Sequence, residues 1–206
     1  MIPIVLDPEM ASIALVGRGA IALSRLGWLR DGGARDLAVF SDRPSPGLEE
    51  AAGEHLRRHL PDTAELAGFQ VVWIADLPLE TALPLAHAVR RNGGLVNVED
   101  VKQGCDFHNP ALVRRGDLLL TVSTNGRSPG LAARIRRQLA DLFGPEWADR
   151  LSQIGRKRRA WKRRERPLAE LARLTDATID SKSWLQAAPA ASTGPAAGQP
   201  AAGGLT

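Results

Sequence analysis

A glycine-rich turn near the start of the chain has the residue types that bind a dinucleotide. Residues 17–22 read Gly-Arg-Gly-Ala-Ile-Ala and fit the pattern G-x-G-x-x-G/A. In that pattern Gly17 permits a tight turn, Gly19 lets the backbone approach a pyrophosphate, and Ala22 lets a helix pack closely on the preceding strand. The N–H groups and the dipole at the start of that helix would then face the phosphates. A strand-to-helix turn that binds nothing is the alternative.

Two charged residues follow this turn at a spacing that is typical of the adenosine end of such a site. Asp42 and Arg43 lie about 20 residues further on, where an acidic residue normally bonds the adenosine ribose of NAD. Arg43 would instead favour the 2′-phosphate of NADP, and two loop charges without a ligand are a third interpretation. We predict NAD, with Asp42 as its ribose ligand.

The surrounding pattern predicts the elements that must position these residues. An apolar run, a stretch with helical spacing and a second apolar run occupy residues 12–40. Further apolar runs follow at 69–75, 95–98 and 118–122, with a helical stretch reaching residue 91. Strands that alternate with helices predict an α/β fold, a Rossmann-type parallel sheet with helices on both faces. Such sheets bind ligands at the carboxyl ends of their strands.

The second half of the chain shows a different pattern. Helices are predicted over residues 129–143, 146–164 and 168–174, without a strand signal. From residue 186 onward the chain is almost wholly Ala, Pro, Gly, Ser, Thr and Gln, and we predict a disordered tail there.

Charge is segregated along the chain. Residues 134–166 hold 12 Lys and Arg against 4 Asp and Glu, so this segment carries +8 and the remainder −4. A basic block implies a polyanionic partner: nucleic acid, an anionic membrane or a small molecule with many carboxylates. Cys105 is the only cysteine, which excludes an internal disulfide and a cysteine-based zinc site. No apolar stretch approaches the roughly 18 residues of a membrane span, so we expect a cytoplasmic protein.

Three further segments carry a resemblance to a known family. They read Leu-Val-Asn-Val-Glu-Asp at 95–100, Phe-His-Asn-Pro-Ala at 107–111 and Thr-Val-Ser-Thr-Asn-Gly-Arg-Ser-Pro at 121–129. Together with the glycine turn, they resemble the precorrin-2 dehydrogenase / sirohydrochlorin ferrochelatase family, which includes the amino-terminal part of siroheme synthase. The similarity covers about residues 1–185, including the basic stretch 156–166.

The resemblance implies NAD-dependent oxidation of precorrin-2 to sirohydrochlorin in siroheme biosynthesis. In some members it also implies insertion of ferrous iron, and it implies an intertwined homodimer. The substrate is a carboxylate-rich tetrapyrrole, which would give the +8 segment a role in binding it. The expected organisation is an NAD-binding domain (1–112), a dimerisation and substrate segment (113–145), a basic helical domain (146–185) and the disordered tail (186–206).

The family's functional positions can be carried over to this chain. Asp100 matches the acidic residue proposed as the general base, although it could instead cap the next turn. Ser128 matches a serine of the substrate region, although Ser before Pro is also an ordinary helix N-cap. The predicted cofactor ligands are Gly17, Gly19, Ala20, Ile21, Asp42 and Arg43, and the predicted substrate ligands are Ser128, Arg158, Arg159 and Arg163.

Some positions depart from the family pattern. Arg18 replaces the middle of three successive glycines, Ser24-Arg25 replaces an Arg-Lys pair, and Ala75-Asp76-Leu77-Pro78 replaces A-T-D-D. His108 would handle a metal or a proton if the chain chelates iron, and otherwise has no chemical role. We predict no resident metal.

One competing function uses the same basic residues. An NAD-responsive, nucleic-acid-binding regulator would employ the basic helical region, but only its charge supports this interpretation.

Overall fold

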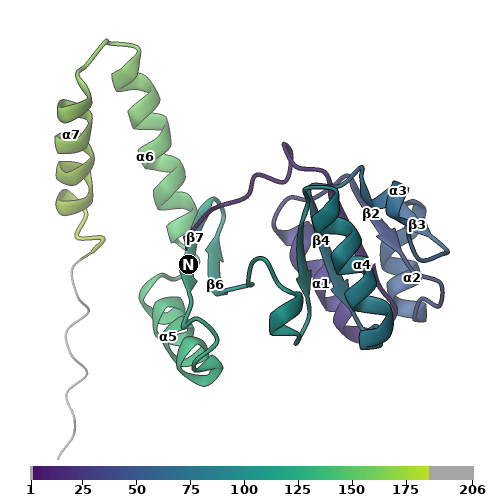
Figure 1. The fold of residues 1–206 in the computed structure, drawn as a ribbon. Coiled ribbons are helices and arrows are strands. Elements are labelled where there is room, and N and C mark those ends of the chain that lie inside the picture. The colour runs from purple at the N-terminus through teal and green to yellow at the C-terminus, as the bar shows by residue number, and fades with distance from the viewer. Residues whose placement is uncertain (1, 186–206) are drawn as a thin grey trace, which may run out of the picture. The chain divides into compact units, whose positions relative to one another are not determined.

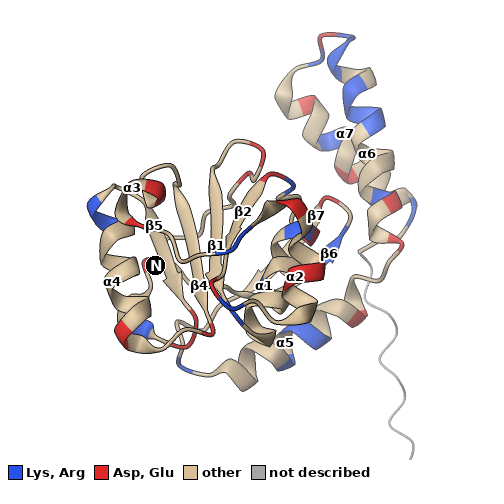
Figure 2. Cartoon of the chain, turned by 90° about the vertical axis from the view of Figure 1, so that its right-hand side faces the viewer, with Lys and Arg blue, Asp and Glu red and all other residues tan. Residues whose placement is uncertain are grey.

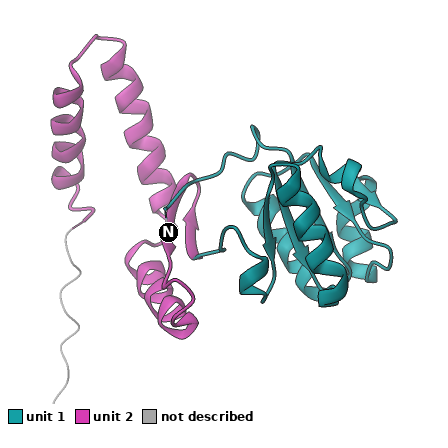
Figure 3. Ribbon diagram, in the orientation of Figure 1, with its two compact units in different colours: residues 1–110 teal, residues 111–206 magenta. Residues whose placement is uncertain are grey.

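The computed structural model describes residues 2–185, which fall into two compact units that meet in the sequence between residues 110 and 111 (Figure 3). The predicted disordered tail, 186–206, lies outside the described residues. None of the helices between residues 2 and 185 is long and apolar enough to cross a membrane.

The first unit is built on a five-stranded parallel sheet. The strand order is β3-β2-β1-β4-β5, so the chain crosses from one half of the sheet to the other between β3 and β4. This arrangement confirms the predicted Rossmann-type fold. The strands are β1 (Ile13–Gly17), β2 (Leu37–Phe40), β3 (Leu56–Arg57), β4 (Val71–Ala75) and β5 (Leu95–Val98).

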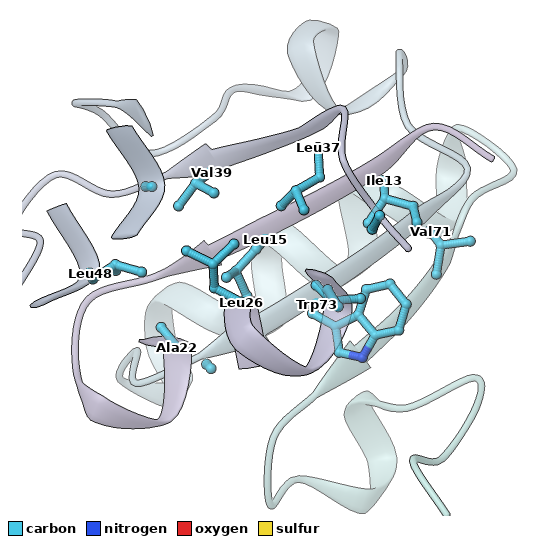
Figure 4. Packing of buried hydrophobic residues seen from close by; sticks show 13 residues of the cluster. Ile13, Leu15, Ala22, Leu26, Leu37, Val39, Leu48, Val71 and Trp73 are labelled. Carbon is cyan, nitrogen blue, oxygen red and sulfur yellow. The ribbon is translucent and has the colours of Figure 1, made fainter. Parts of the chain in front are cut away.

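Helices cover both faces of this sheet (Figure 1). One face packs against α1 (Ala20–Asp31) and α2 (Pro46–Ala52), and the other against α3 (Thr63–Leu66) and α4 (Leu79–Arg91). Alternate residues of β1 pack into the apolar clusters on the two faces of the sheet, because successive side chains of a strand point to opposite faces. Leu15 packs with Leu26 and Trp73 on the α1 side (Figure 4), and Val16 packs with the α4 side.

The chain segment after β5 covers the free edge of that strand. It includes a 3₁₀ helix at Lys102–Gly104. The Asp106 N–H donates to the Val96 carbonyl at 2.8 Å, and the Val96 N–H donates to Asp106 Oδ2 at 3.0 Å. Arg90 of α4 holds the same carboxylate through Nε at 2.8 Å. These bonds replace the pairing that an exposed edge strand would otherwise offer to another chain.

The second unit, as far as residue 185, consists of a hairpin and three helices. The elements are β6 (Ala111–Arg115), β7 (Leu118–Val122), α5 (Pro129–Leu142), α6 (Trp147–Lys162) and α7 (Leu168–Ser181). The expectation that 118–122 adds a strand to the parallel sheet was wrong, because β7 pairs antiparallel with β6 in a separate sheet. The predicted carboxy-terminal helices are confirmed, and α7 extends seven residues beyond the predicted range.

Candidate dinucleotide site

The glycine turn joins β1 to α1 at the carboxyl edge of the sheet. In the strand order, β1 lies between β2 and β4, and open α/β sheets bind ligands where the strand order reverses. A Cβ atom at Gly17 would lie 2.5 Å from the Ala75 carbonyl oxygen and 2.7 Å from Ala22 Cβ. Any side chain at position 17 would therefore push β1 away from β4 or from α1.

An aspartate from the neighbouring strand reaches the start of α1. Gly19 is the N-cap of this helix and offers no side chain, whereas Asp76 Oδ2 accepts from the Ala22 N–H at 2.8 Å. A Cβ atom at Gly19 would lie 2.9 Å from the same oxygen. The N–H groups of Ala20 and Ile21 have no partner within the helix and are the donors that remain for a pyrophosphate. Sequence reasoning gave Asp76 no role, although its position directly after β4 was a usable signal.

The adenosine end of the site contains an ion pair. Arg18 donates from Nε to Asp42 Oδ1 and from Nη2 to Asp42 Oδ2, both at 2.7 Å. Arg43 Nε lies 3.8 Å from Asp42 Oδ2. The hydrogen bonds from Arg18 hold the pKa of the Asp42 carboxyl below its usual value, so Asp42 is ionised at neutral pH. Arg18, one of the residues that depart from the family pattern, therefore connects the glycine turn to the predicted ribose ligand Asp42.

The end of β5 carries a second ion pair beside the predicted base. Arg25 of α1 donates through Nη2 to both carboxylate oxygens of Glu99, at 2.8 and 2.7 Å. Asp100 follows with φ = 60° and an exposed side chain. Its carboxylate makes no hydrogen bond to any residue in the range 2–185, so it does not cap the following turn. Asp100 is thus an accessible carboxylate at the carboxyl edge of the sheet.

The motifs around Asp100 hold the backbone in place. Asn97 is buried and donates from Nδ2 to the Phe107 carbonyl at 2.8 Å. Asn109 donates to Asn97 Oδ1 at 3.3 Å and accepts from Trp73 Nε1 at 3.1 Å. This network holds the segment after β5 against the sheet. It gives a structural reason for Asn97 in the 95–100 segment and for Asn109 in the 107–111 segment.

Cys105 and His108 lie beside this network. Burial raises the pKa of the Cys105 thiol, which donates to the Val98 carbonyl at 3.1 Å. His108 is exposed. Within residues 2–185, no three His, Cys, Asp or Glu side chains are grouped so that they could hold a metal ion.

In the second unit, Ser128 acts as the N-cap of α5. Its Oγ accepts from the Leu131 N–H at 3.2 Å, and Thr124 Oγ1 accepts from the Ser128 N–H at 3.2 Å. The cap uses the Ser128 hydroxyl as an acceptor and leaves its proton available for donation.

Of the predicted substrate-binding cations, Arg158 and Arg159 lie on α6 and Arg163 is its C-cap. Figure 2 shows Lys and Arg in blue along this helix. Arg158 is half-buried, and Arg159 and Arg163 are exposed. Among the described residues, none of the three has a carboxylate within 4.0 Å. Arg150 and Arg166, by contrast, are paired with Glu146 and Glu170. The three arginines are therefore available to an anionic ligand.

Two family models match the sequence. The family described as putative NAD(P)-binding matches residues 4–111, and that described as the central part of a sirohaem biosynthesis protein matches residues 115–142.

Several curated relatives are siroheme synthases. The protein of Methylococcus capsulatus is 32% identical over 140 residues, covering 67% of this chain and 30% of the relative. Those of Nitrosococcus oceani and Gluconobacter oxydans are 30% and 31% identical, and each alignment covers 77% of this chain and 34% or 35% of the relative. The chain thus spans about a third of the length of these relatives.

A solved structure shares the fold. The protein named SirC, precorrin-2 dehydrogenase, superposes with a TM-score of 0.71 and 24% identity. The match covers 90% of this chain and 93% of that chain.

Proposed function

Because the chain belongs to the precorrin-2 dehydrogenase / sirohydrochlorin ferrochelatase family, we propose that it oxidises precorrin-2 to sirohydrochlorin with NAD⁺ in siroheme biosynthesis. One observation supports this most strongly: the glycine turn lies between β1 and α1 where the strand order reverses, and Asp100 lies two residues after β5 at the same edge of the sheet.

The residues of the turn fit a dinucleotide. Gly17 keeps β1, β4 and α1 close together, and the N–H groups of Ala20 and Ile21 at the start of α1 receive the pyrophosphate. Asp42 and Arg43 bind the adenosine ribose. When bound, NAD⁺ supplies the acceptor for the hydride that leaves precorrin-2.

Loss of a hydride must be accompanied by loss of a proton, and Asp100 takes that proton in our proposal. Its carboxylate is exposed and makes no hydrogen bond to any other described residue, so it is free to act as a base. Ser128, Arg158, Arg159 and Arg163 bind the carboxylates of the substrate by charge-assisted and neutral hydrogen bonds.

Asp100→Asn tests the mechanism. Asn is also tolerated at positive φ and keeps the shape of the side chain, but it cannot take the proton. We expect the variant to bind NAD⁺ with unchanged affinity and to form sirohydrochlorin about 10²- to 10⁴-fold more slowly under anaerobic conditions. Asp36→Asn, an exposed aspartate just before β2, is the matched control and should be fully active.

Two results distinguish an error in the role of Asp100 from an error in the proposed activity. If the variant keeps more than about a third of the wild-type rate, Asp100 is not the base. If the wild-type protein itself, supplied with precorrin-2 and NAD⁺, forms no sirohydrochlorin, the proposed activity is wrong.

Ferrous iron insertion, homodimerisation and a cytoplasmic location are further proposals that rest on the family. Iron enters as a substrate: adding ferrous iron to the completed oxidation should convert sirohydrochlorin to siroheme. Sedimentation of the purified protein tests the dimer.

A further inference from the structure

Arg18 lies at the adenosine end of the proposed cofactor site and is fixed on two sides. Its carbonyl oxygen accepts from the Ser45 N–H at 2.7 Å, and its guanidinium forms the two-bond pair with Asp42. Its side chain is only 18% exposed, against 74% for Arg43. The guanidinium is therefore a built-in part of the site.

The charges around Asp42 differ from those of a site that accepts only NAD. There, an unpaired acidic residue bonds the ribose hydroxyls and repels a 2′-phosphate. Here, two guanidinium groups, of Arg18 and Arg43, lie within 4.0 Å of the single carboxylate of Asp42. The three groups together carry +1 at neutral pH, so they attract a phosphate dianion.

Donors also remain for such a phosphate. A guanidinium has five N–H groups, and Arg18 uses one on Nε and one on Nη2 for Asp42. Its other N–H groups, including both on Nη1, make no hydrogen bond to any residue from 2 to 185. Arg43 is mostly exposed and can turn toward a ligand. The Asp42 oxygens keep lone pairs for ribose hydroxyls, because a carboxylate accepts about four hydrogen bonds.

We propose that Arg18 and Arg43 form a subsite for the 2′-phosphate, so that the protein binds NADP⁺ as well as NAD⁺. The inference rests on the proposed function, since it places the adenosine ribose beside Asp42. Arg18 is then the residue that determines cofactor specificity, and Asp42 serves the ribose of either cofactor.

Calorimetric titration with NAD⁺ and with NADP⁺ tests this subsite without using turnover. We expect the two dissociation constants of the wild-type protein to agree within about tenfold, because arginine–phosphate bonds offset the repulsion from Asp42. Arg18→Gln should weaken NADP⁺ binding about 10- to 100-fold, as expected for losing a hydrogen bond to a charged group. NAD⁺ binding should change less than about threefold, because Asp42 retains its oxygens for the ribose.

Two further variants separate the subsite from general effects of charge. Asp42→Asn should shift the preference the other way, toward NADP⁺, because it removes the only negative charge of the cluster. Arg35→Gln removes an exposed arginine that precedes β2 and should leave both affinities unchanged.

The outcomes of these titrations test the 2′-phosphate subsite separately from the proposed dehydrogenase function. A wild-type Kd for NADP⁺ more than tenfold above that for NAD⁺, or equal effects of Arg18→Gln on both cofactors, would overturn the subsite and leave the dehydrogenase proposal intact. If neither cofactor binds the wild-type protein, the proposed function fails first.

Discussion

Asp76 and Asp100 follow the adjacent strands β4 and β5, and both have positive φ, yet their carboxylates have different surroundings. Their φ angles are 54° and 60°, in the left-handed region that Asp and Asn tolerate better than most residues. Asp76 is tied to the α1 backbone, whereas the Asp100 carboxylate is free of hydrogen bonds to residues 2–185. The Asp76 carboxylate therefore stabilises the start of α1, whereas the Asp100 carboxylate is free to accept a proton.

Gly19→Asp should abolish NAD⁺ binding. The new side chain would start 2.9 Å from Asp76 Oδ2, at the position where the pyrophosphate must approach the α1 amino terminus. Gly27→Asp adds the same side chain to the same helix, where a Cβ would meet nothing within 4 Å. Titration of both folded variants with NAD⁺ measures the difference. Near-normal affinity of the Gly19 variant would mean that the cofactor binds elsewhere.

Asp76→Asn should strengthen NAD⁺ binding severalfold. The amide oxygen can still accept from the Ala22 N–H, but the negative charge that opposes the pyrophosphate is gone. The loss of that charge at the helix amino terminus should cost about 0.3–1 kcal/mol of unfolding free energy. Denaturant unfolding and NAD⁺ titration give the two quantities, with Asp36→Asn as the control. Weaker cofactor binding in a stable variant would show that Asp76 takes part in binding.

For single residues, the sequence predicted the glycine turn and the location of Asp42 and Asp100. The turn follows a recognisable apolar strand directly, and each aspartate lies two residues after the end of one. It did not predict the partners of these residues. The Arg18–Asp42 pair joins positions 24 residues apart, and the Asp76–Ala22 bond joins positions 54 apart. Such pairings follow from strand order and side-chain direction, which local spacing does not define.

At the scale of single elements, side chains hydrogen-bond the backbone at both ends of α5. Ser128 caps its amino terminus, and Arg115 of β6 donates to the Phe143 and Ala140 carbonyls at 2.8 and 3.2 Å. The last carbonyls of a helix have no partner within it, so Arg115 fastens the hairpin to the helix end. Ser128, the serine of the predicted substrate region, therefore belongs to a helix that Arg115 holds in place at its other end.

A pair of substitutions separates the two roles of Ser128. Ser128→Ala should lower the unfolding free energy by about 1 kcal/mol through loss of the cap. Ser128→Asn keeps an N-cap acceptor and should restore stability, so any defect that it retains in the KM for precorrin-2 belongs to substrate binding. Steady-state kinetics and denaturant unfolding of both variants make the comparison. If Ser128→Asn has the wild-type unfolding free energy and the wild-type KM for precorrin-2, Ser128 acts only as a helix cap.

The elements that sequence reasoning missed are short or polar. β3 has two residues and α3 has four, too few for a periodic pattern to develop. β6 ends in Arg114-Arg115, which weakened its apolar signal. A usable signal was the two-residue loop Gly116-Asp117, since glycine with positive φ is favoured in tight hairpins and Gly116 has φ = 57°. That loop also explains why β7 pairs with β6.

For the whole molecule, the two units have opposite net charge. Residues 1–110 hold 10 Lys and Arg against 15 Asp and Glu, whereas residues 111–206 hold 17 against 8. The net charges are thus −5 and +9. A carboxylate-rich substrate would be attracted by the second unit and repelled by the first.

Neutralising three arginines of α6 and its carboxyl end tests this electrostatic role. Arg158, Arg159 and Arg163, changed together to Gln, should raise the apparent KM for precorrin-2 and reduce its dependence on salt, because fewer charge-assisted bonds remain to be screened. A control with Arg35, Arg91 and Arg173 changed to Gln removes the same charge from exposed positions elsewhere. The Kd for NAD⁺ should be unchanged in both. If the two triple variants show the same KM and the same salt dependence, net charge alone attracts the substrate, and the three α6 arginines are a solvated helix face.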